Sequence, residues 1–309
     1  MSKKLGLGKL SKEDFNRLVR PHIPTDKIEL DGATVPLTDQ SIIAHNPSIG
    51  VPIEALGFFA FHYSASNVAC KFGTPTNLII GIYLPLGTSE SDLVTIAKVL
   101  GGEASKYGVK ITAGQTGTYY GLEIPLLTAT CIGKAVRKSR ALEPSDKVLI
   151  VNEIGGESIW LKELSEGKSR FNWRQFTPLP TILALHEVDS VKMMHDVSEG
   201  GVKGSLLEIV EDSCIRIDFS SKYLVYARGS QEINSDVLRG PSYGTLIVIS
   251  EQNGANHIIT KCSQLGIHCV IAGEISKGHG LFINETEIKP EKRIDLDELY
   301  GSFYKTRVE

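Results

Sequence analysis

The spacing of apolar residues along the first half of the chain predicts helices and strands in alternation. Capping residues at the start and proline or glycine at the end predict three helices, at 11–21, 53–73 and 89–108. Short runs rich in isoleucine and leucine predict strands between and after them, at 41–44, 77–84, 109–112 and 124–132.

The second half repeats this alternation after a clear apolar strand at 147–151. Helices are predicted at 177–188, from 202 onward and at 255–265, and strands at 215–219, 244–250 and 268–272. The polar segment Arg140–Asp146 is the best boundary between the halves. We therefore expect an α/β or α+β protein with two domains, residues 1–145 and 146–309.

Composition narrows the class of protein. A chain of 309 residues with 41% hydrophobic and 22% charged residues is typical of a globular protein with a sizeable core. The net charge of −3 gives no reason to expect nucleic acid or an anionic membrane as a partner. Five scattered cysteines predict reduced thiols, and neither a signal peptide nor a membrane span is recognisable, so we expect a cytoplasmic protein.

The segment with the most chemical content lies between a predicted strand and a predicted helix. It reads His195-Asp196-Val197-Ser198-Glu199-Gly200-Gly201. Paired glycines at a helix start let a phosphate approach the backbone, where unpaired N–H groups and the helix dipole attract anions. The alternative is a tight turn that serves packing alone.

This string resembles the His-Asp-x-Thr-Glu-Gly-Gly signature of one ATP-binding superfamily. Its members include aminoimidazole ribonucleotide (AIR) synthase, selenophosphate synthetase, thiamine-monophosphate kinase and hydrogenase maturation protein E. Further segments resemble other motifs of that superfamily in the same order, and the Gly114 segment is similar to the hydrogenase-maturation branch. They are Gly6–Leu10, Asp31–Val35, His45–Pro47, Ser64–Ala69 with Gly73–Pro75, Gly114–Thr116 with Tyr120–Leu122, and Ser242–Leu246.

The resemblance implies a fold, a ligand and partners. The N-terminal domain would be a mixed β-sheet with helices that forms a homodimer, and the C-terminal domain an α/β domain that closes over ATP or another nucleotide. A small-molecule substrate would be activated by phosphoryl transfer, and a maturation-type protein partner is compatible with the related branch. Nucleotide or phosphate would be bound by Lys9, Asp31, Asn46, Asn67, Gly114, Gln115, Thr116, Ser198, Glu199, Gly200 and Gly201.

His195 and Asp196 are the candidate catalytic residues. By the same resemblance they would position the substrate or transfer a proton, although a buried structural His–Asp pair explains them equally well.

The chain departs from the superfamily where magnesium would bind. Gly32, Asn46 and Asn67 stand at the positions of the metal-binding aspartates, and Asp31 remains as one weak metal ligand. Magnesium prefers carboxylate oxygens, whereas asparagine can donate to a phosphate oxygen directly. Binding of Mg²⁺ is therefore expected to be weak. The chain also lacks the terminal cysteine of the hydrogenase-maturation branch, so that branch's chemistry does not carry over.

Two functions follow from these features. The first is ATP-dependent phosphoryl transfer to a small carbonyl, amide or phosphorylated substrate. The second is a non-catalytic relative that binds a nucleotide or another phosphorylated ligand, or serves as a scaffold. The missing carboxylates favour the second, and the retained glycine turns oppose a pure scaffold.

Overall fold

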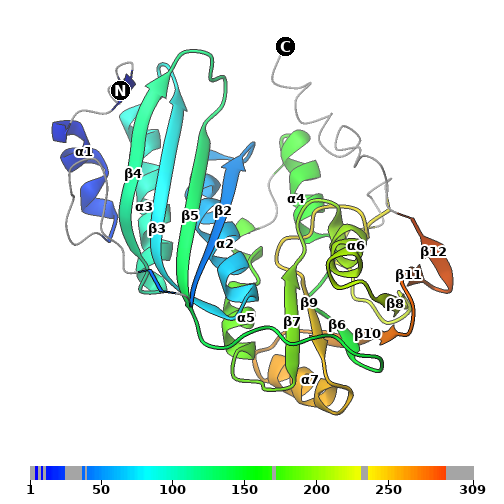
Figure 1. Ribbon diagram of the computed structural model, residues 1–309. Coiled ribbons are helices and arrows are strands. Elements are labelled where there is room, and N and C mark those ends of the chain that lie inside the picture. The colour runs from blue at the N-terminus through cyan, green and yellow to red at the C-terminus, as the bar shows by residue number, and fades with distance from the viewer. Residues whose placement is uncertain are drawn as a thin grey trace. The chain divides into compact units, whose positions relative to one another are not determined.

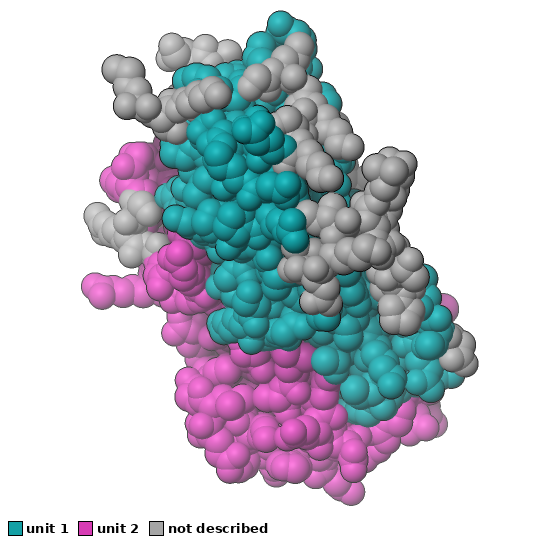
Figure 2. Space-filling view, turned by 90° about the vertical axis from the view of Figure 1, so that its left-hand side faces the viewer, with its two compact units in different colours: residues 1–138 teal, residues 139–309 magenta. Residues whose placement is uncertain are grey.

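A computed structural model describes residues 4–5, 8–9, 12–24, 37–38, 40–168, 172–230 and 236–289. The chain divides into two compact units, Met1–Lys138 and Ser139–Glu309, coloured separately in Figure 2. The sequence predicted the boundary between the domains after residue 145, seven residues later than in the structure. The assignment of nucleotide binding and dimerisation to residues 1–145 stays a prediction.

The first unit is a five-stranded mixed sheet with two long helices on one face (Figure 1). The strand order is β1-β4-β3-β5-β2, with β3 and β4 parallel and the other pairs antiparallel. Its elements are β1 (Gly8–Lys9), α1 (Lys12–Leu18), η1 (Arg20–His22), β2 (Ser41–Ile49), α2 (Ile53–Cys70), β3 (Gly73–Pro85), α3 (Glu90–Lys106), β4 (Lys110–Tyr119) and β5 (Leu126–Ala135).

The helix prediction at 89–108 holds because its capping chemistry is local. Ser89 and Asp92 form a reciprocal capping box at the start of α3, as the sequence indicated. Helix α2 is buried on nearly all sides, since it packs against both the sheet and α3.

Strands β2, β3 and β4 of this unit are longer than predicted, and β2 and β3 each contain a proline that the prediction placed outside the strand. Strand β2 continues through Pro47, which an edge strand tolerates because its outer N–H groups need no partner. Residues Gly73–Pro75, predicted to be a helix stop, also begin β3. The register shifts between Pro75 and Asn77, so a bulge absorbs the missing proline N–H.

The second unit contains a seven-stranded sheet in the order β12-β11-β8-β10-β6-β9-β7, in which only β8 and β11 pair in parallel among the described strands. The elements are β6 (Lys147–Val151), α4 (Gly156–Ser165), η2 (Trp173–Gln175), α5 (Leu179–Leu185), β7 (Val191–Asp196), α6 (Gly201–Ser213), β8 (Arg216–Phe219), β9 (Leu246–Ser250), η4 (Gln252–Gly254), α7 (Ala255–Gln264), β10 (Cys269–Ser276), β11 (Gly280–Ile283) and β12 (Thr286–Ile288).

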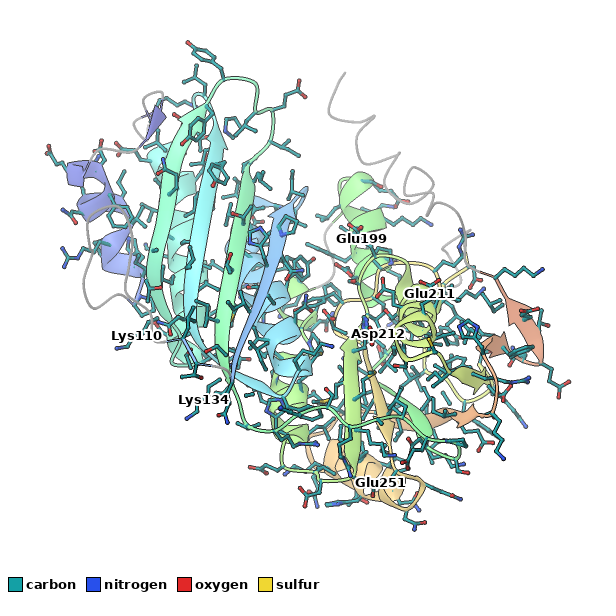
Figure 3. All side chains as sticks on the ribbon, in the orientation of Figure 1. Lys110, Lys134, Glu199, Glu211, Asp212 and Glu251 are labelled. Carbon is teal, nitrogen blue, oxygen red and sulfur yellow. The ribbon has the colours of Figure 1, made fainter. Side chains whose placement is uncertain are left out.

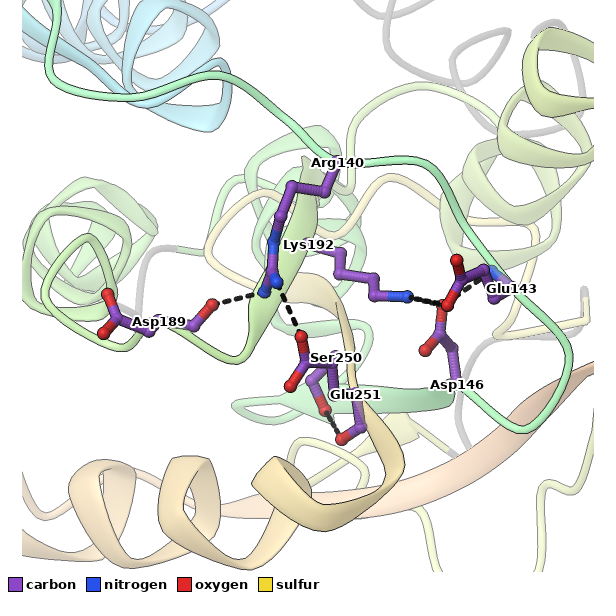
Figure 4. A network of polar contacts seen from close by, with 7 residues as sticks. All are labelled: Arg140, Glu143, Asp146, Asp189, Lys192, Ser250 and Glu251. Atoms are coloured by element: carbon purple, nitrogen blue, oxygen red, sulfur yellow. Dashed lines mark hydrogen bonds and ion pairs between the residues drawn. The ribbon is translucent and has the colours of Figure 1, made fainter.

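The segment that enters the second unit is held along the edge strand β7 by a network of charges (Figure 4). The ammonium of Lys192 donates to Asp146 Oδ2 at 2.9 Å and to Glu143 Oε2 at 3.1 Å. Arg140 pairs with Glu251 at 2.6 Å and also donates to the carbonyl of Asp189. These contacts attach residues 140–146 to the second unit.

The fold agrees with the expected α/β and α+β layering, with mixed sheets and helices in both units. Among the described residues, no helix is long and apolar enough to cross a membrane.

Candidate functional site

Two sequence-selected asparagines meet in the first unit. Asn46 lies on β2 and Asn67 on α2, and Asn67 Nδ2 donates to Asn46 Oδ1 at 3.1 Å. Both residues are half-buried. Asn46 lies opposite Ala129 on β5, so its side chain is on the sheet face that α2 and α3 cover.

The residues selected on β4 form a separate group. Gly114 is in register with Asn46 across the two strands β3 and β5 that lie between them. Three strand spacings separate the two residues, which corresponds to about 14 Å. Thr116 is buried on that face, whereas Gln115 is on the opposite one, where its Nε2 donates to Tyr119 Oη at 3.0 Å. Lys9, on the neighbouring strand β1, pairs through its backbone with Gly117.

Gly114 has a packing role that the sequence did not reveal. A Cβ at this position would collide with the backbone carbonyl oxygen of Ile80 on the adjacent strand. The glycine is therefore required for close approach of β3 and β4, with or without a ligand. Asp31, selected as a phosphate and weak metal ligand, and Gly32 lie outside the described residues.

In the second unit, His195 and Asp196 end β7, directly before the turn that opens α6. His195 Nδ1 contacts the carbonyl oxygen of Asp196 at 2.6 Å, and Nε2 contacts Glu208 Oε2 at 3.1 Å. A carbonyl and a carboxylate both accept hydrogen bonds, so making both contacts at once requires a proton on each ring nitrogen, which is the imidazolium form.

The electrostatics of this pair agree with that protonation state. Burial lowers the pKa of His195, but the hydrogen bond with Glu208 and the charge of Asp196 outweigh it, so the pKa is raised overall. Burial also raises the pKa of Asp196, against the opposing charge of His195. A doubly donating imidazolium is no base, so proton abstraction by His195 would require these contacts to break; its catalytic role stays a prediction.

The Ser198–Gly201 turn has the left-handed glycine geometry that the sequence indicated. Gly200 has φ +84° and Gly201 has φ +61°, while Ser198 and Glu199 are exposed. Figure 3 shows Glu199 near the start of α6. The N–H of Gly201 donates to Ser198 O at 3.1 Å, and that of Lys203 donates to Leu238 O at 2.9 Å. Part of the helix start is therefore already hydrogen-bonded within the protein.

A second segment of the chain lies against this turn. A Cβ on Gly201 would come within 2.5 Å of Leu238 O and 2.6 Å of Gly240 O. The side chain of Lys203 pairs with Asp236 in the same segment. Gly201 is therefore needed for packing, as in the alternative of a tight turn that serves packing alone. Gly200 remains the candidate position at which a ligand contacts the backbone. The contact with residues 236–240 was not predictable, because nothing local to either segment indicates it.

The loop before β9 forms hydrogen bonds with the residues at the start of α4. Gly155 begins this helix with φ +88°, and its N–H donates to Ser242 Oγ at 2.7 Å. Ser242 also contacts Thr245 at 2.8 Å, and the buried Glu157 accepts from the N–H of Tyr243 at 2.7 Å. The Ser242–Leu246 motif therefore holds a helix start in place.

The donor set does not fit a magnesium ion. An amide pair that is hydrogen-bonded to itself offers no negatively charged oxygen, and Mg²⁺ is bound by carboxylates and phosphates. Over the part of the chain that the structure describes, no group of three or more His, Cys, Asp or Glu side chains could hold a metal. Weak Mg²⁺ binding stays a prediction, because Asp31 lies outside the described residues.

Each unit thus combines a mixed sheet with helices, with the amide pair in the first unit and the glycine-initiated helices in the second. Residues 143–284 match the family described as AIR synthase related protein, C-terminal domain. The resemblance seen in the sequence is thereby confirmed for these residues, which make up most of the second unit.

Several known proteins are similar to this chain in sequence or in structure. Thiamine-monophosphate kinase of Pyrococcus horikoshii is 24% identical over 266 residues, which are 78% of this chain and 77% of that protein. The hydrogenase maturation protein HypE of E. coli superposes with a TM-score of 0.82 at 18% identity, over 92% of this chain and 97% of that one.

Two further structures show what HypE proteins bind. A HypE structure in complex with ATP has a TM-score of 0.79 at 17% identity, covering 93% of this chain and 96% of that chain. A chain of a solved HypE–HypF complex has a TM-score of 0.71 at 19% identity, covering 82% of this chain and 90% of that one. At these identities the structures establish the fold, and both HypE and thiamine-monophosphate kinase share it.

Proposed function

We propose that this protein binds ATP or another phosphorylated ligand and lacks the metal-assisted phosphoryl transfer of its catalytic relatives. The Asn46–Asn67 amide pair carries the proposal, because it stands where the resemblance puts metal-binding aspartates. A phosphate can accept hydrogen bonds from amides without an intervening cation. The solved HypE–ATP complex, which has the same fold, supports a nucleotide as the ligand.

Phosphoryl transfer to a small carbonyl, amide or phosphorylated substrate is the second candidate. The relative from Pyrococcus horikoshii, a thiamine-monophosphate kinase, favours it. Phosphoryl transfer depends on charge neutralisation at the transferred group, usually by magnesium. The amide pair, which supplies no metal-binding carboxylate, therefore makes the binding function the better-supported of the two.

Gly200 tests the binding proposal. Gly200 precedes α6 with a left-handed backbone (φ +84°), so Gly200→Val, which disturbs the proposed phosphate-binding turn, should reduce the affinity for ATP at least tenfold in titration calorimetry. Valine at this φ adds roughly 1–3 kcal/mol of strain, so circular dichroism must show that the variant is folded. Gly200→Asn, which tolerates the conformation better, provides a second variant with the same expected loss.

The matched control lies one turn further along α6. A Cβ on Gly204 would have only Glu199 O near it, at 3.5 Å, so Gly204→Ala should leave both binding and folding intact. If both Gly200 variants bind ATP as tightly as the natural protein, the turn serves packing alone.

A homodimer through the first unit is also part of the proposal. The sheet face opposite α2 and α3 exposes Ile43 and Ile49 of β2, at 57% and 45% of their full surface. A self-complementary apolar face suits pairing with a second copy. The partner could also be a maturation-type protein, as HypF is for HypE in a solved complex.

Light scattering should therefore give twice the chain mass of 33.7 kDa for the natural protein. Ile43→Lys/Ile49→Lys places two charges on the open face and should give a monomer with unchanged secondary structure. A monomeric natural protein at micromolar concentration would contradict the dimer.

A further inference from the structure

Asn46 and Asn67 join two elements that are distant in sequence. Asn46 lies in the middle of the edge strand β2, and Asn67 is near the end of α2, which packs on that strand. Their side chains meet with Nδ2 of Asn67 donating to Oδ1 of Asn46 at 3.1 Å, in half-buried surroundings. The pair is neutral and supplies both the donor and the acceptor of its own contact.

Two carboxylates could not occupy these positions in the same way. At this separation, with water partly excluded, two aspartates would repel strongly and neither could donate to the other unless it took up a proton. A divalent cation between them would relieve the repulsion. Two amides need no such cation, because the hydrogen bond itself links β2 and α2.

We infer that the Asn46–Asn67 amide pair replaces a bridging divalent cation, so that this protein binds its phosphorylated ligand without magnesium. The ligand part of this inference rests on the proposed function. The replacement of the cation stands on the geometry of the pair and is testable with metal alone.

The test converts the pair back to carboxylates. Asn46→Asp/Asn67→Asp should unfold at a temperature roughly 5–10 °C lower than the natural protein in the presence of a chelator, because the carboxylates repel. Adding MgCl₂ or MnCl₂, without nucleotide, should recover most of this loss. The natural protein should show the same unfolding temperature with metal and with chelator.

The control must make the same chemical change elsewhere. Asn253 and Asn256 lie on the exposed surface at η4 and the start of α7. Asn253→Asp/Asn256→Asp adds the same two charges and should respond to metal no more than the natural protein does. The single variant Asn46→Asp keeps a donor in Asn67 and covers the case in which the double variant fails to fold.

Specific outcomes decide the inference. A rise in the natural protein's unfolding temperature with magnesium alone would overturn it, since a cation would then already bind. A folded double variant whose unfolding temperature does not change with metal would also overturn it. A double variant that is unfolded in chelator and does not fold when metal is added would overturn it as well. Absence of nucleotide binding would refute the proposed function while leaving this metal test valid.

Discussion

Gly101→Ala is expected to lower the free energy of unfolding by about 3 kcal/mol or more, the largest effect of any substitution considered for the first unit. Gly101 lies on α3, where the η1 segment crosses the helix. A Cβ there would collide with the carbonyl oxygen of His22 and approach its carbonyl carbon to 2.7 Å and Ile23 Cα to 3.0 Å. The obstacles are backbone atoms, so no rotamer change relieves them.

The adjacent residue supplies the control. Gly102 is on the same helix, is exposed and has no atom within 4 Å of its ideal Cβ. Gly102→Ala should therefore stabilise α3 by about 0.5–1 kcal/mol through the higher helix propensity of alanine. Chemical denaturation of both variants measures the contrast. Equal effects of the two substitutions would show that η1 does not pack on Gly101.

The second large effect is expected in the network along β7. Asp146 is 5% exposed and accepts hydrogen bonds from Lys192 Nζ and from the N–H of Glu143, at 2.9 and 2.7 Å. Asp146→Ala leaves the buried Lys192 ammonium with only Glu143, whose side chain is 72% exposed. Breaking a buried pair costs about 3–5 kcal/mol, and this substitution should cost about 2–3 kcal/mol in denaturant unfolding, because Glu143 remains as a partner of Lys192.

Two further variants distinguish the ion pair from simple loss of packing. Asp146→Ala/Lys192→Met removes both charges and should be more stable than Asp146→Ala alone. Glu251→Gln breaks the ion pair with Arg140, in which the side chains of Arg140 and Glu251 are 42% and 48% exposed. This substitution should lower the free energy of unfolding by less than about 1 kcal/mol. A double variant that is less stable than Asp146→Ala would refute the charge argument.

The fold was predictable where its causes are local. The capping box at Ser89 and the apolar run Lys147–Val151 gave correct elements because both signals lie within a few residues. Helix α4 was missed because it opens on Gly155-Gly156 and carries no side-chain cap. The hairpin of β11 and β12 was also missed, because its four- and three-residue strands are too short to show alternation.

The candidate site was predictable in its parts but not in its contacts. The sequence indicated Asn46 and Asn67 separately, and only the packing of α2 on β2 brings them to 3.1 Å. It also indicated Gly200-Gly201 as a pair, whereas the structure divides their roles, because residues 238–240 occupy the Cβ side of Gly201. Such contacts depend on tertiary structure, which no local pattern encodes.

One titration tests the central claim most directly. ATP is titrated calorimetrically into the natural protein, once with magnesium and once with a chelator. The account predicts saturable binding with the same affinity, within about twofold, in both conditions, because amides donate to phosphates without an intervening cation. Tight binding that disappears with the chelator would contradict the account, and so would the absence of binding in both conditions.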